Sequence, residues 1–463
     1  MISAKSSNNH EECSPRPAAM ISSLRAFGYD LPMAIADLID NSIYACARTV
    51  KVDYDWNDGD PWIRVLDDGR GMTEGQLREA MRLGSQSPLE TRHVEDLGRF
   101  GLGLKTASFS QCKLLTVHTK THEGNSATRS WDLEHVCDSG KWELGIEAPR
   151  ESHEQLAVLD SLESGTIVLC QKLDRIIRSK VNRGQDACSS FLEAFGTVAR
   201  YLEMVFHRYL AGRDNVTIFV GRHRCKPWDP FLKSNEFTQH LSVEYLDDHQ
   251  ITVRPFVLPH VSKRSQEETF QGAGLYGWNS HQGFYIYRNK RMIIPGGYLD
   301  LPFKAEEHYK LCRIQIDLPN HLDHQWGIDV RKAAARPPSN VRGDLERIAR
   351  ASRTHAAEVY RARAGKLHKT SHQKEKHDVW IRKPLGDKVI YRINRNNEAI
   401  KRILAEIDPP ASWVKKLFHL IEKTVPHRLI ILDNANHEDC LVDLPPEFQP
   451  PPDGLIKLCC EIF

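Results

Sequence analysis

The first 185 residues interleave apolar positions at helical spacing with short runs at strand spacing. A helix is predicted from Asp30-Leu31-Pro32, because Asp30 suits an N-cap and a proline is tolerated in the first turn. A second helix is predicted near Thr73, because Thr73 and Gln76 have the spacing of a capping box. The apolar stripe of the first helix falls on Ile35, Leu38, Ile39, Ile43 and Cys46. Strands are predicted at 51–56, 62–66, 113–119, 128–133 and 166–173.

The pattern changes after a helix that is predicted over residues 189–211. Alternation at period two then becomes frequent, which places the start of a second, strand-rich domain near residue 186. A further helix is predicted from Val341 to about Arg363, followed by a linker over 365–377 that is rich in Lys and His. The strands predicted in this second domain lie at 215–220, 250–257, 283–287 and 311–318.

These patterns divide the chain into five expected segments. A polar arm, an α/β domain and an α+β domain come first, and a basic helix with its linker follows. Within the second segment, residues 84–103 hold five glycines or prolines and little periodicity, so a long mobile loop is expected there. The fold of the last segment is left open. The segments cover residues 1–17, 18–185, 186–340, 341–377 and 378–463.

The protein has 463 residues, of which 40% are hydrophobic and 27% are charged. This balance is ordinary for a soluble globular protein and excludes global disorder. No apolar run approaches the roughly 18–20 residues that span a membrane, and the polar N-terminus lacks the apolar core of a secretory signal. A cytoplasmic protein without a membrane segment is therefore expected. The formal net charge of +2 gives no global argument for nucleic-acid binding.

Eleven cysteines are scattered from Cys13 to Cys460, and no two have the C-x-x-C spacing. This pattern indicates reduced thiols and predicts no structural zinc site. Basic residues outnumber acidic ones between residues 342 and 374. A solvated helix face is the favoured interpretation of that stripe, and a face that follows a DNA backbone is the alternative.

Three short segments carry the candidate chemistry. The first, Asp37-Leu-Ile-Asp40-Asn41, lies on the first predicted helix, where Asp37 and Asn41 share one face one turn apart. A carboxylate beside an amide oxygen suits a general base that orients water next to a Mg²⁺ ligand. A polar helix face in solvent would give the same pattern, so this segment alone decides nothing.

The second segment, Val65-Leu-Asp67-Asp68-Gly69-Arg70-Gly71-Met72, runs from a predicted strand into an acidic turn. An Asp at a strand end can accept a hydrogen bond from the exocyclic amine of a base, and glycine permits close backbone approach. The third, Gly98-Arg-Phe-Gly101-Leu-Gly103-Leu-Lys105, is a glycine-rich stretch before a helical start and so a natural phosphate cradle. It is not a Walker A loop, because Leu104 separates Gly103 from Lys105.

In this order and at these separations, the three segments resemble the motifs of the GHKL (Bergerat-fold) ATPase family. That family includes gyrase B subunits, MutL, heat-shock chaperone ATPases, histidine kinases and MORC proteins. Ser164-Gly165-Thr166 resembles the family's fourth motif. The sequence I-A-D-L-I-D-N-S-I is most similar to that of prokaryotic MORC-like and MutL-like ATPases. The implied fold is an α/β two-layer sandwich, followed by an α+β transducer domain and a small C-terminal region.

The resemblance implies a role for each matching residue. Asp37 takes the place of the family's catalytic Glu, and Asn41 that of its Mg²⁺ ligand. Because Asp37 is one methylene shorter than Glu, slow hydrolysis is expected. The residues expected at the adenine are Asp67, Gly69, Gly71, Met72 and Thr166. The residues expected to close over the phosphates are Gly98, Arg99, Phe100, Gly101, Leu102, Gly103 and Lys105.

The resemblance also implies that the second domain sends a Lys to the γ-phosphate of ATP. The best match is Lys332, in the segment that begins at Trp326, with Arg331 in reserve. The turn Arg288-Asn-Lys290-Arg291 is another basic candidate, although an exposed basic loop is the favoured interpretation there.

The implied function is a Mg²⁺-dependent, ATP-hydrolysing clamp that forms a homodimer when ATP binds. Its expected client is DNA, in restriction or anti-phage defence with partner proteins of a defence operon. The N-terminal arm is the candidate for exchange between protomers. Two alternatives stay open: a chaperone-like ATPase that acts on protein clients, and a non-hydrolysing scaffold gated by nucleotide.

Overall fold

The computed structural model describes residues 15–26, 28–84, 103–175, 187–212, 215–328, 335–370, 379–385, 388–397, 400–401 and 412–424. It divides the chain into two compact units, Met1–Tyr360 and Arg361–Phe463. Residues 1–14 of the predicted arm and residues 85–102 of the predicted loop lie outside the described residues. Among the residues that the structure does describe, no helix has both the length and the apolar character that crossing a bilayer requires.

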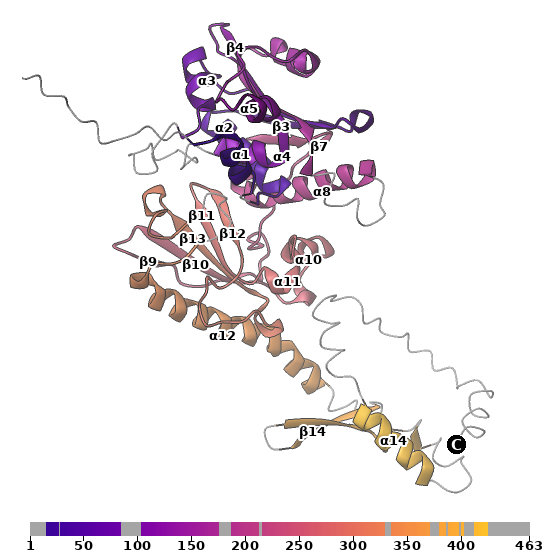
Figure 1. Ribbon diagram of the computed structural model, residues 1–463. Coiled ribbons are helices and arrows are strands. Elements are labelled where there is room, and N and C mark those ends of the chain that lie inside the picture. Colours follow the sequence, from indigo (N-terminus) through magenta and orange to yellow (C-terminus); the bar gives the residue numbers. More distant parts are fainter. Residues whose placement is uncertain are drawn as a thin grey trace, which may run out of the picture. The chain divides into compact units, whose positions relative to one another are not determined.

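The first sheet of the larger unit has seven strands in the order β4-β3-β5-β2-β1-β6-β7 (Figure 1). All neighbours in it are antiparallel except β1 and β6, which pair in parallel. β6 and β7 come from beyond the predicted start of the second domain. The strands are β1 (Thr49–Asp55), β2 (Trp62–Asp67), β3 (Cys112–Lys120), β4 (Ser126–Asp132), β5 (Gly165–Leu173), β6 (Thr217–Val220) and β7 (His223–Arg224).

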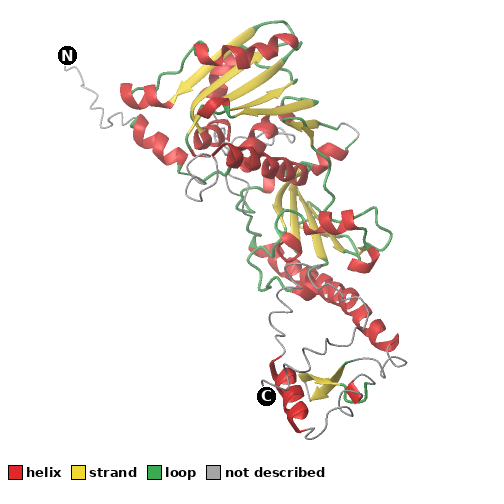
Figure 2. Cartoon of the chain, turned by 90° about the vertical axis from the view of Figure 1, so that its right-hand side faces the viewer, coloured by secondary structure: helices red, strands yellow, loops and turns green. Residues whose placement is uncertain are grey.

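A layer of helices packs on this sheet and encloses its main apolar core (Figure 2). Ile35 and Ile39 of one helix, Phe109 of another and the strand residues Val52 and Val65 all lie in this core. Both predicted helix starts are confirmed: the Asp30 carboxylate accepts from the Met33 amide, and Thr73 and Gln76 form the capping box. The helices are α1 (Pro17–Arg25), α2 (Leu31–Tyr44), α3 (Glu74–Met81), α4 (Gly103–Gln111), α5 (Leu133–Ser139), α6 (His153–Leu156), α8 (Ala187–Val205) and α9 (His207–Ala211).

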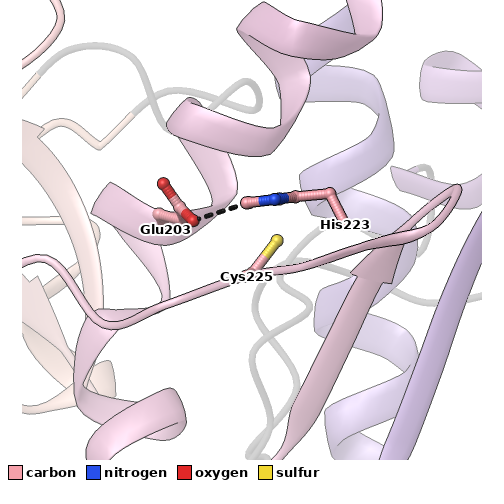
Figure 3. A group of neighbouring side chains, drawn as sticks. All are labelled: Glu203, His223 and Cys225. Carbon is pink, nitrogen blue, oxygen red and sulfur yellow. Dashed lines mark hydrogen bonds and ion pairs between the residues drawn. The ribbon is translucent and has the colours of Figure 1, made fainter.

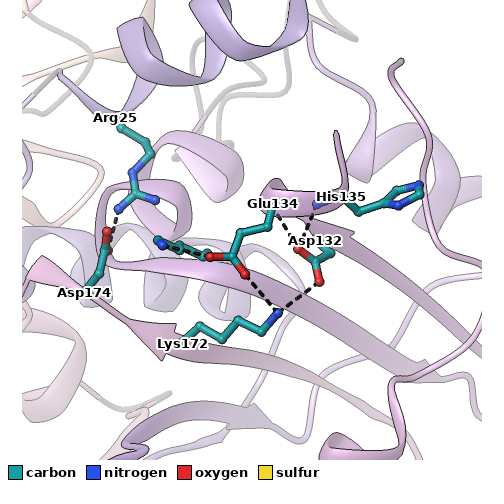
Figure 4. A network of polar contacts seen from close by, with 7 residues as sticks. Arg25, Asp132, Glu134, His135, Lys172 and Asp174 are labelled. Atoms are coloured by element: carbon teal, nitrogen blue, oxygen red, sulfur yellow. Dashed lines mark hydrogen bonds and ion pairs between the residues drawn. The ribbon is translucent and has the colours of Figure 1, made fainter. Parts of the chain in front are cut away.

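A network of charged side chains joins the outer strands of this sheet to α5 (Figure 4). Lys172 at the end of β5 lies 3.1 Å from the Asp132 carboxylate and 3.3 Å from that of Glu134. Asp132 also caps α5, since it accepts from the backbone amides of Glu134 and His135. Arg25 of α1 pairs with Asp174, which follows β5. The network therefore fixes the end of β5 against α1 and α5.

The second sheet follows the order β12-β11-β13-β10-β8, with β9 paired to β10. Alternate side chains of β11 pack into two different apolar cores. Phe284 and Ile286 pack in the cluster that contains α12, whereas Tyr285 and Tyr287 belong to the main core of the first layer. The elements are β8 (Gln239–His240), β9 (Glu244–Leu246), β10 (Ile251–Val257), β11 (Gly283–Arg288), β12 (Arg291–Pro295), β13 (Cys312–Leu318), α10 (Gln266–Ala273) and α11 (Gly277–Ser280).

Helix α12 (Ser339–Thr370) extends beyond its predicted end near Arg363, so the first residues of the predicted linker are helical. Its apolar face fills the second core with Leu345 and Ile348. Several basic residues of the predicted stripe are paired or buried: Arg347 contacts Glu244, Arg350 contacts Glu346, and Arg353 is buried against the ring of Tyr309.

The smaller unit contains a hairpin of β14 (Trp380–Leu385) and β15 (Lys388–Ile393), and helix α14 (Ser412–Thr424). The Glu422 carboxylate of α14 accepts from Arg392 at 2.8 Å and from the Ile393 amide at 3.0 Å. These bonds hold α14 against β15.

Candidate functional site

One end of the site is centred on Asp67, the last residue of β2. Its carboxylate accepts from the Ser42 hydroxyl of α2 at 2.8 Å and from the Gly69 amide at 3.0 Å. Burial raises the pKa of Asp67 to about 6, although these hydrogen bonds oppose the shift. A buried carboxylate at a strand end is suited to accept a hydrogen bond from a base.

The turn after Asp67 passes so close to other backbone that two positions require glycine. A side chain at Gly69 would begin 2.8 Å from the Ala45 carbonyl, and one at Gly71 would begin 2.1 Å from that of Lys120. Gly71 also has a φ of +68°, which L-residues with side chains adopt only under strain. The next residue, Met72, is half-buried and leads into α3.

A hydroxyl network connects this turn to β5. Thr119 lies opposite Thr166 in the β3–β5 register, and their hydroxyl oxygens are 3.1 Å apart. Thr119 also accepts from the Met72 amide at 2.9 Å, and Ser164 donates to the Gly69 carbonyl at 2.7 Å. Thr166 itself pairs with Asp67 in the β2–β5 register. The structure thus brings the predicted adenine-side residues Asp67, Gly69, Gly71, Met72 and Thr166 together.

The other end of the site is the face of α2 that carries Asp37 and Asn41. Asp37 is buried, and its carboxylate accepts from the Tyr29 hydroxyl at 3.0 Å. Asn41, one turn later, is exposed. Gly103 begins α4, and a Cβ there would lie 3.9 Å from an Asp37 oxygen. The N-terminus of α4, where backbone amides favour an anion, therefore lies beside this carboxylate.

Lys105 of α4 is almost fully buried, and its ammonium donates to the Ala80 carbonyl of α3 at 2.9 Å. Burial lowers the pKa of Lys105 to about 8, against the opposing charge of Glu79. Five further residues expected to close over the phosphates lie outside the described residues: Gly98, Arg99, Phe100, Gly101 and Leu102. Arg331 and Lys332 also lie outside the described residues.

The interpretation of the turn at Arg288–Arg291 as an exposed basic loop holds for Lys290, which is exposed, but is wrong for both arginines, which are buried. Arg288 pairs with Asp323 at 2.5 Å, within the second-sheet region. Arg291 lies 3.1 Å from the Asp40 carboxylate of α2, and its guanidinium covers the Phe206 ring. Burial would lower the pKa of Arg291, but the charges of Asp40 and other neighbours raise it. The second sheet thus contacts the helix that carries Asp37.

Sequence reasoning did not select four residues of this arrangement: Tyr29, Ser42, Asp40 and Thr119. Ser42 directly follows the Asp-Asn pair, so its place beside the motif was a signal. Thr119 gave none, because its role depends on how distant strands pair, and Tyr29 lies outside the motif, eight positions before Asp37. Asp40 lay inside the motif, but only the fold reveals its partner in β12.

Comparison with known proteins gives a consistent result. The family described as "Histidine kinase-, DNA gyrase B-, and HSP90-like ATPase" matches residues 29–166. The "Structural maintenance of chromosomes flexible hinge domain-containing protein 1" of Homo sapiens is 35% identical over 104 residues, covering 17% of this chain and 5% of that protein. The Mus musculus counterpart matches equally. The Caenorhabditis elegans "ATPase morc-1" is 31% identical over 87 residues, covering 19% and 10%.

The similarity therefore spans only a small part of each relative. The family match falls on the segments that build the site, since it begins at Tyr29 and ends at Thr166. The two-layer arrangement of sheet and helices agrees with that fold. The chain carries a GHKL-type ATPase domain, of the histidine kinase-, DNA gyrase B- and HSP90-like class, over residues 29–166.

Proposed function

We propose that the protein binds ATP between the Asp67 and Asp37 ends of this site and hydrolyses it with Mg²⁺. The observation that carries the proposal is the convergence of three elements. The end of β2 offers a buried carboxylate, α2 offers Asp37 and Asn41 on one face, and the N-terminus of α4 lies beside Asp37. An acceptor for a base, a polar helix face and an anion site fit the parts of one nucleotide.

The adenine is assigned to the Asp67 end. Asp67 accepts from the exocyclic amine, and the turn with Gly69 and Gly71 provides the close backbone wall. The contacts of Ser42 and Thr119 support this assignment, because they hold Asp67 and Thr166 in place. Binding requires the carboxylate form of Asp67.

The phosphates are assigned to the N-terminus of α4. The donor set fits Mg²⁺, because Asn41 presents an exposed amide oxygen one turn from the Asp37 carboxylate, and Mg²⁺ prefers oxygen ligands shared with phosphates and water. Asn41 would hold the ion, which supplies charge neutralisation at the phosphates. Lys332, or Arg331, is our proposal for the γ-phosphate contact from the second domain.

Asp37 is the proposed general base. Its hydrogen bond from Tyr29 and its position beside α4 support this role, because both orient the carboxylate. Since Asp is shorter than Glu, turnover is slow. ATP then stays bound for a long time before it is hydrolysed, which suits a clamp that stays closed while ATP is bound.

We extend the proposal to a clamp that forms a homodimer with ATP and acts on DNA. The Arg291–Asp40 pair supports nucleotide coupling, because it joins the second sheet to α2. The name of the matching human protein refers to chromosomes, which supports DNA as the client. The paired arginines of α12 give no support for a DNA face on that helix. A role in restriction or anti-phage defence rests on the MORC-like sequence alone.

The test is steady-state phosphate release from ATP with Mg²⁺, with and without duplex DNA. Wild-type protein turns over ATP slowly, and DNA raises the rate. Asp37→Asn lowers the rate by about 100-fold or more, because a general base contributes roughly 10²–10⁴-fold, and it still binds ATP. Binding without turnover in the wild-type protein would favour the nucleotide-gated scaffold. Stimulation by unfolded protein instead of DNA would favour the chaperone-like ATPase.

A further inference from the structure

Three side chains with metal-binding chemistry meet away from the nucleotide site (Figure 3). Glu203 is near the end of α8, His223 is in β7, and Cys225 directly follows β7. One donor atom from each, a carboxylate oxygen, an imidazole nitrogen and the thiol sulfur, lies within 4.8 Å of the other two. None of these residues takes part in the ATP site proposed above.

The local backbone explains why they converge. His223 and Cys225 are two residues apart on an extended segment, so their side chains leave it on the same side. The Cys225 amide donates to the Ile218 carbonyl at 2.9 Å, which fixes this segment to β6. Glu203 is oriented from the same segment, because its Oε1 accepts from the Lys226 amide at 2.9 Å.

The donor atoms of the three side chains lie close enough together to reach one metal ion. His223 Nε2 lies 2.9 Å from Glu203 Oε1, and the His223 side chain is 52% exposed. The Cys225 thiol is buried, 4.0 Å from the Ala199 carbonyl. Tetrahedral zinc places its ligand atoms about 3.3–3.8 Å apart. Small side-chain rotations therefore suffice to bring three donors onto one ion.

We infer that Glu203, His223 and Cys225 bind a borderline-soft divalent cation, with Zn²⁺ as the best fit. Thiolate, imidazole and carboxylate together match the ligands that zinc takes in proteins, whereas Mg²⁺ and Ca²⁺ prefer oxygen alone. The His223 side chain is 52% exposed, so water can reach the ion as a fourth ligand.

The proton balance of binding is defined. Burial, helped by the charge of Glu203, raises the pKa of the Cys225 thiol to about 12, so the thiol is protonated without metal. Metal coordination displaces this proton to solvent.

The bound ion would cross-link α8 to the β6–β7 hairpin. Both belong to the main core, and α8 also contributes to the contact with the second sheet. The site is invisible to motif spacing, because Glu203 is 20 positions before His223 and no second cysteine is near. The expectation of no structural zinc site rested on that spacing.

The test is titration of the full chain, freed of metal by a chelator, with Co²⁺ as a spectroscopic probe and then with Zn²⁺. One Co²⁺ binds per chain and gives a thiolate-to-cobalt charge-transfer absorption in the near ultraviolet, which Zn²⁺ bleaches. Cys225→Ser abolishes this absorption. His223→Gln, at a half-exposed position that does not threaten folding, weakens Zn²⁺ binding by about 10-fold or more.

The matched control is Cys46→Ser, which removes an exposed free thiol in α2's C-terminal turn and leaves the absorption unchanged. A charge-transfer absorption that survives Cys225→Ser would overturn the inference. So would the absence of any cobalt–thiolate absorption in the folded wild-type chain, or Zn²⁺ affinity that His223→Gln leaves unchanged. All these readouts are independent of ATP hydrolysis, so the inference stands or falls separately from the proposed function.

Discussion

At the scale of single residues, the buried carboxylate of Asp67 links binding to stability. It is 5% exposed, and burial holds its pKa at about 6, above the model-peptide value of 3.8. The unfolded chain releases this proton near pH 4, whereas the folded chain retains it until about pH 6. The contribution of Asp67 to folding is therefore fully present below pH 3.8 and is lost as the pH rises through 6.

Asp67→Asn is accordingly expected to stabilise the nucleotide-free protein at pH 7.5. A shift of two pKa units corresponds to about 3 kcal/mol, so a gain of about 1–3 kcal/mol is expected. The side-chain amide of this variant can still accept a hydrogen bond from the Gly69 backbone amide and can still contact the Ser42 hydroxyl. The check is the Tm of variant and wild type at pH 7.5 and pH 4.5. The variant melts higher at pH 7.5, and the difference shrinks at pH 4.5. A lower Tm of the variant at pH 7.5 would contradict the account.

Site residues within one contiguous motif could be predicted from the sequence, whereas their partners on distant segments could not. Asp37, Asn41 and Asp67 are predicted because their motifs, taken in order, resemble those of the GHKL family, whereas helical spacing and a strand end alone do not distinguish a site from a polar surface. Thr119 meets Thr166 only because β3 pairs with β5, a register that no local pattern encodes. The Tyr29 contact with Asp37 is local, eight positions apart, but it depends on how the chain enters α2 and not on helical spacing.

At the scale of elements, α2 has contacts with both parts of the larger unit. One face of α2 packs in the main core, and Asp40 of the same helix is paired with Arg291 of β12. Because both charges are buried, removal of one takes a close opposite charge from the other, at a cost of about 3–5 kcal/mol. A substitution in β12 should therefore change the local stability of α2.

Arg291→Met is expected to raise amide hydrogen exchange in both α2 and β11–β12. Its matched control is Arg288→Met, which removes a buried arginine from the same hairpin but breaks a pair with Asp323, in the second-sheet region. The control raises exchange around β11 and leaves α2 unchanged. Equal exchange of α2 in the two variants would show that the Arg291–Asp40 pair does not couple these elements.

The longer strands before residue 320 and the helices α2, α3, α8 and α12 could be predicted, but not how they assemble. The predicted strands of both sheets are confirmed with ends shifted by at most two residues. The helix predicted over 189–211 is interrupted at Phe206, between α8 and α9. β6 has an ordinary strand pattern, yet its parallel pairing with β1 extends the first sheet beyond residue 185. Long-range pairing of this kind has no signature in hydrophobic periodicity.

At the scale of the whole molecule, the larger unit places two sheets on shared helices. Tyr285 and Tyr287 of the second sheet lie in the same apolar cluster as Phe191 and Phe195 of α8. A packed core moves between discrete arrangements rather than deforming continuously. The proposed nucleotide binding at α2 and α4 would therefore bias the second sheet, as the proposed nucleotide-gated clamp requires.

The central claim is that residues 29–166 bind ATP with Asp67 at the adenine. The most direct measurement is calorimetric titration of the full chain with MgATP, comparing wild type, Asp67→Asn and the matched control Asp68→Asn. Asp68 is the neighbouring carboxylate, but it accepts from the amides of Arg48 and Thr49 instead of facing the site.

Wild type and Asp68→Asn are expected to bind one ATP per chain with similar affinity. Asp67→Asn should lose about 10- to 100-fold, as expected for a hydrogen bond to a charged acceptor. Equal affinity of Asp67→Asn and wild type, or no binding by the folded wild-type chain, would contradict the account.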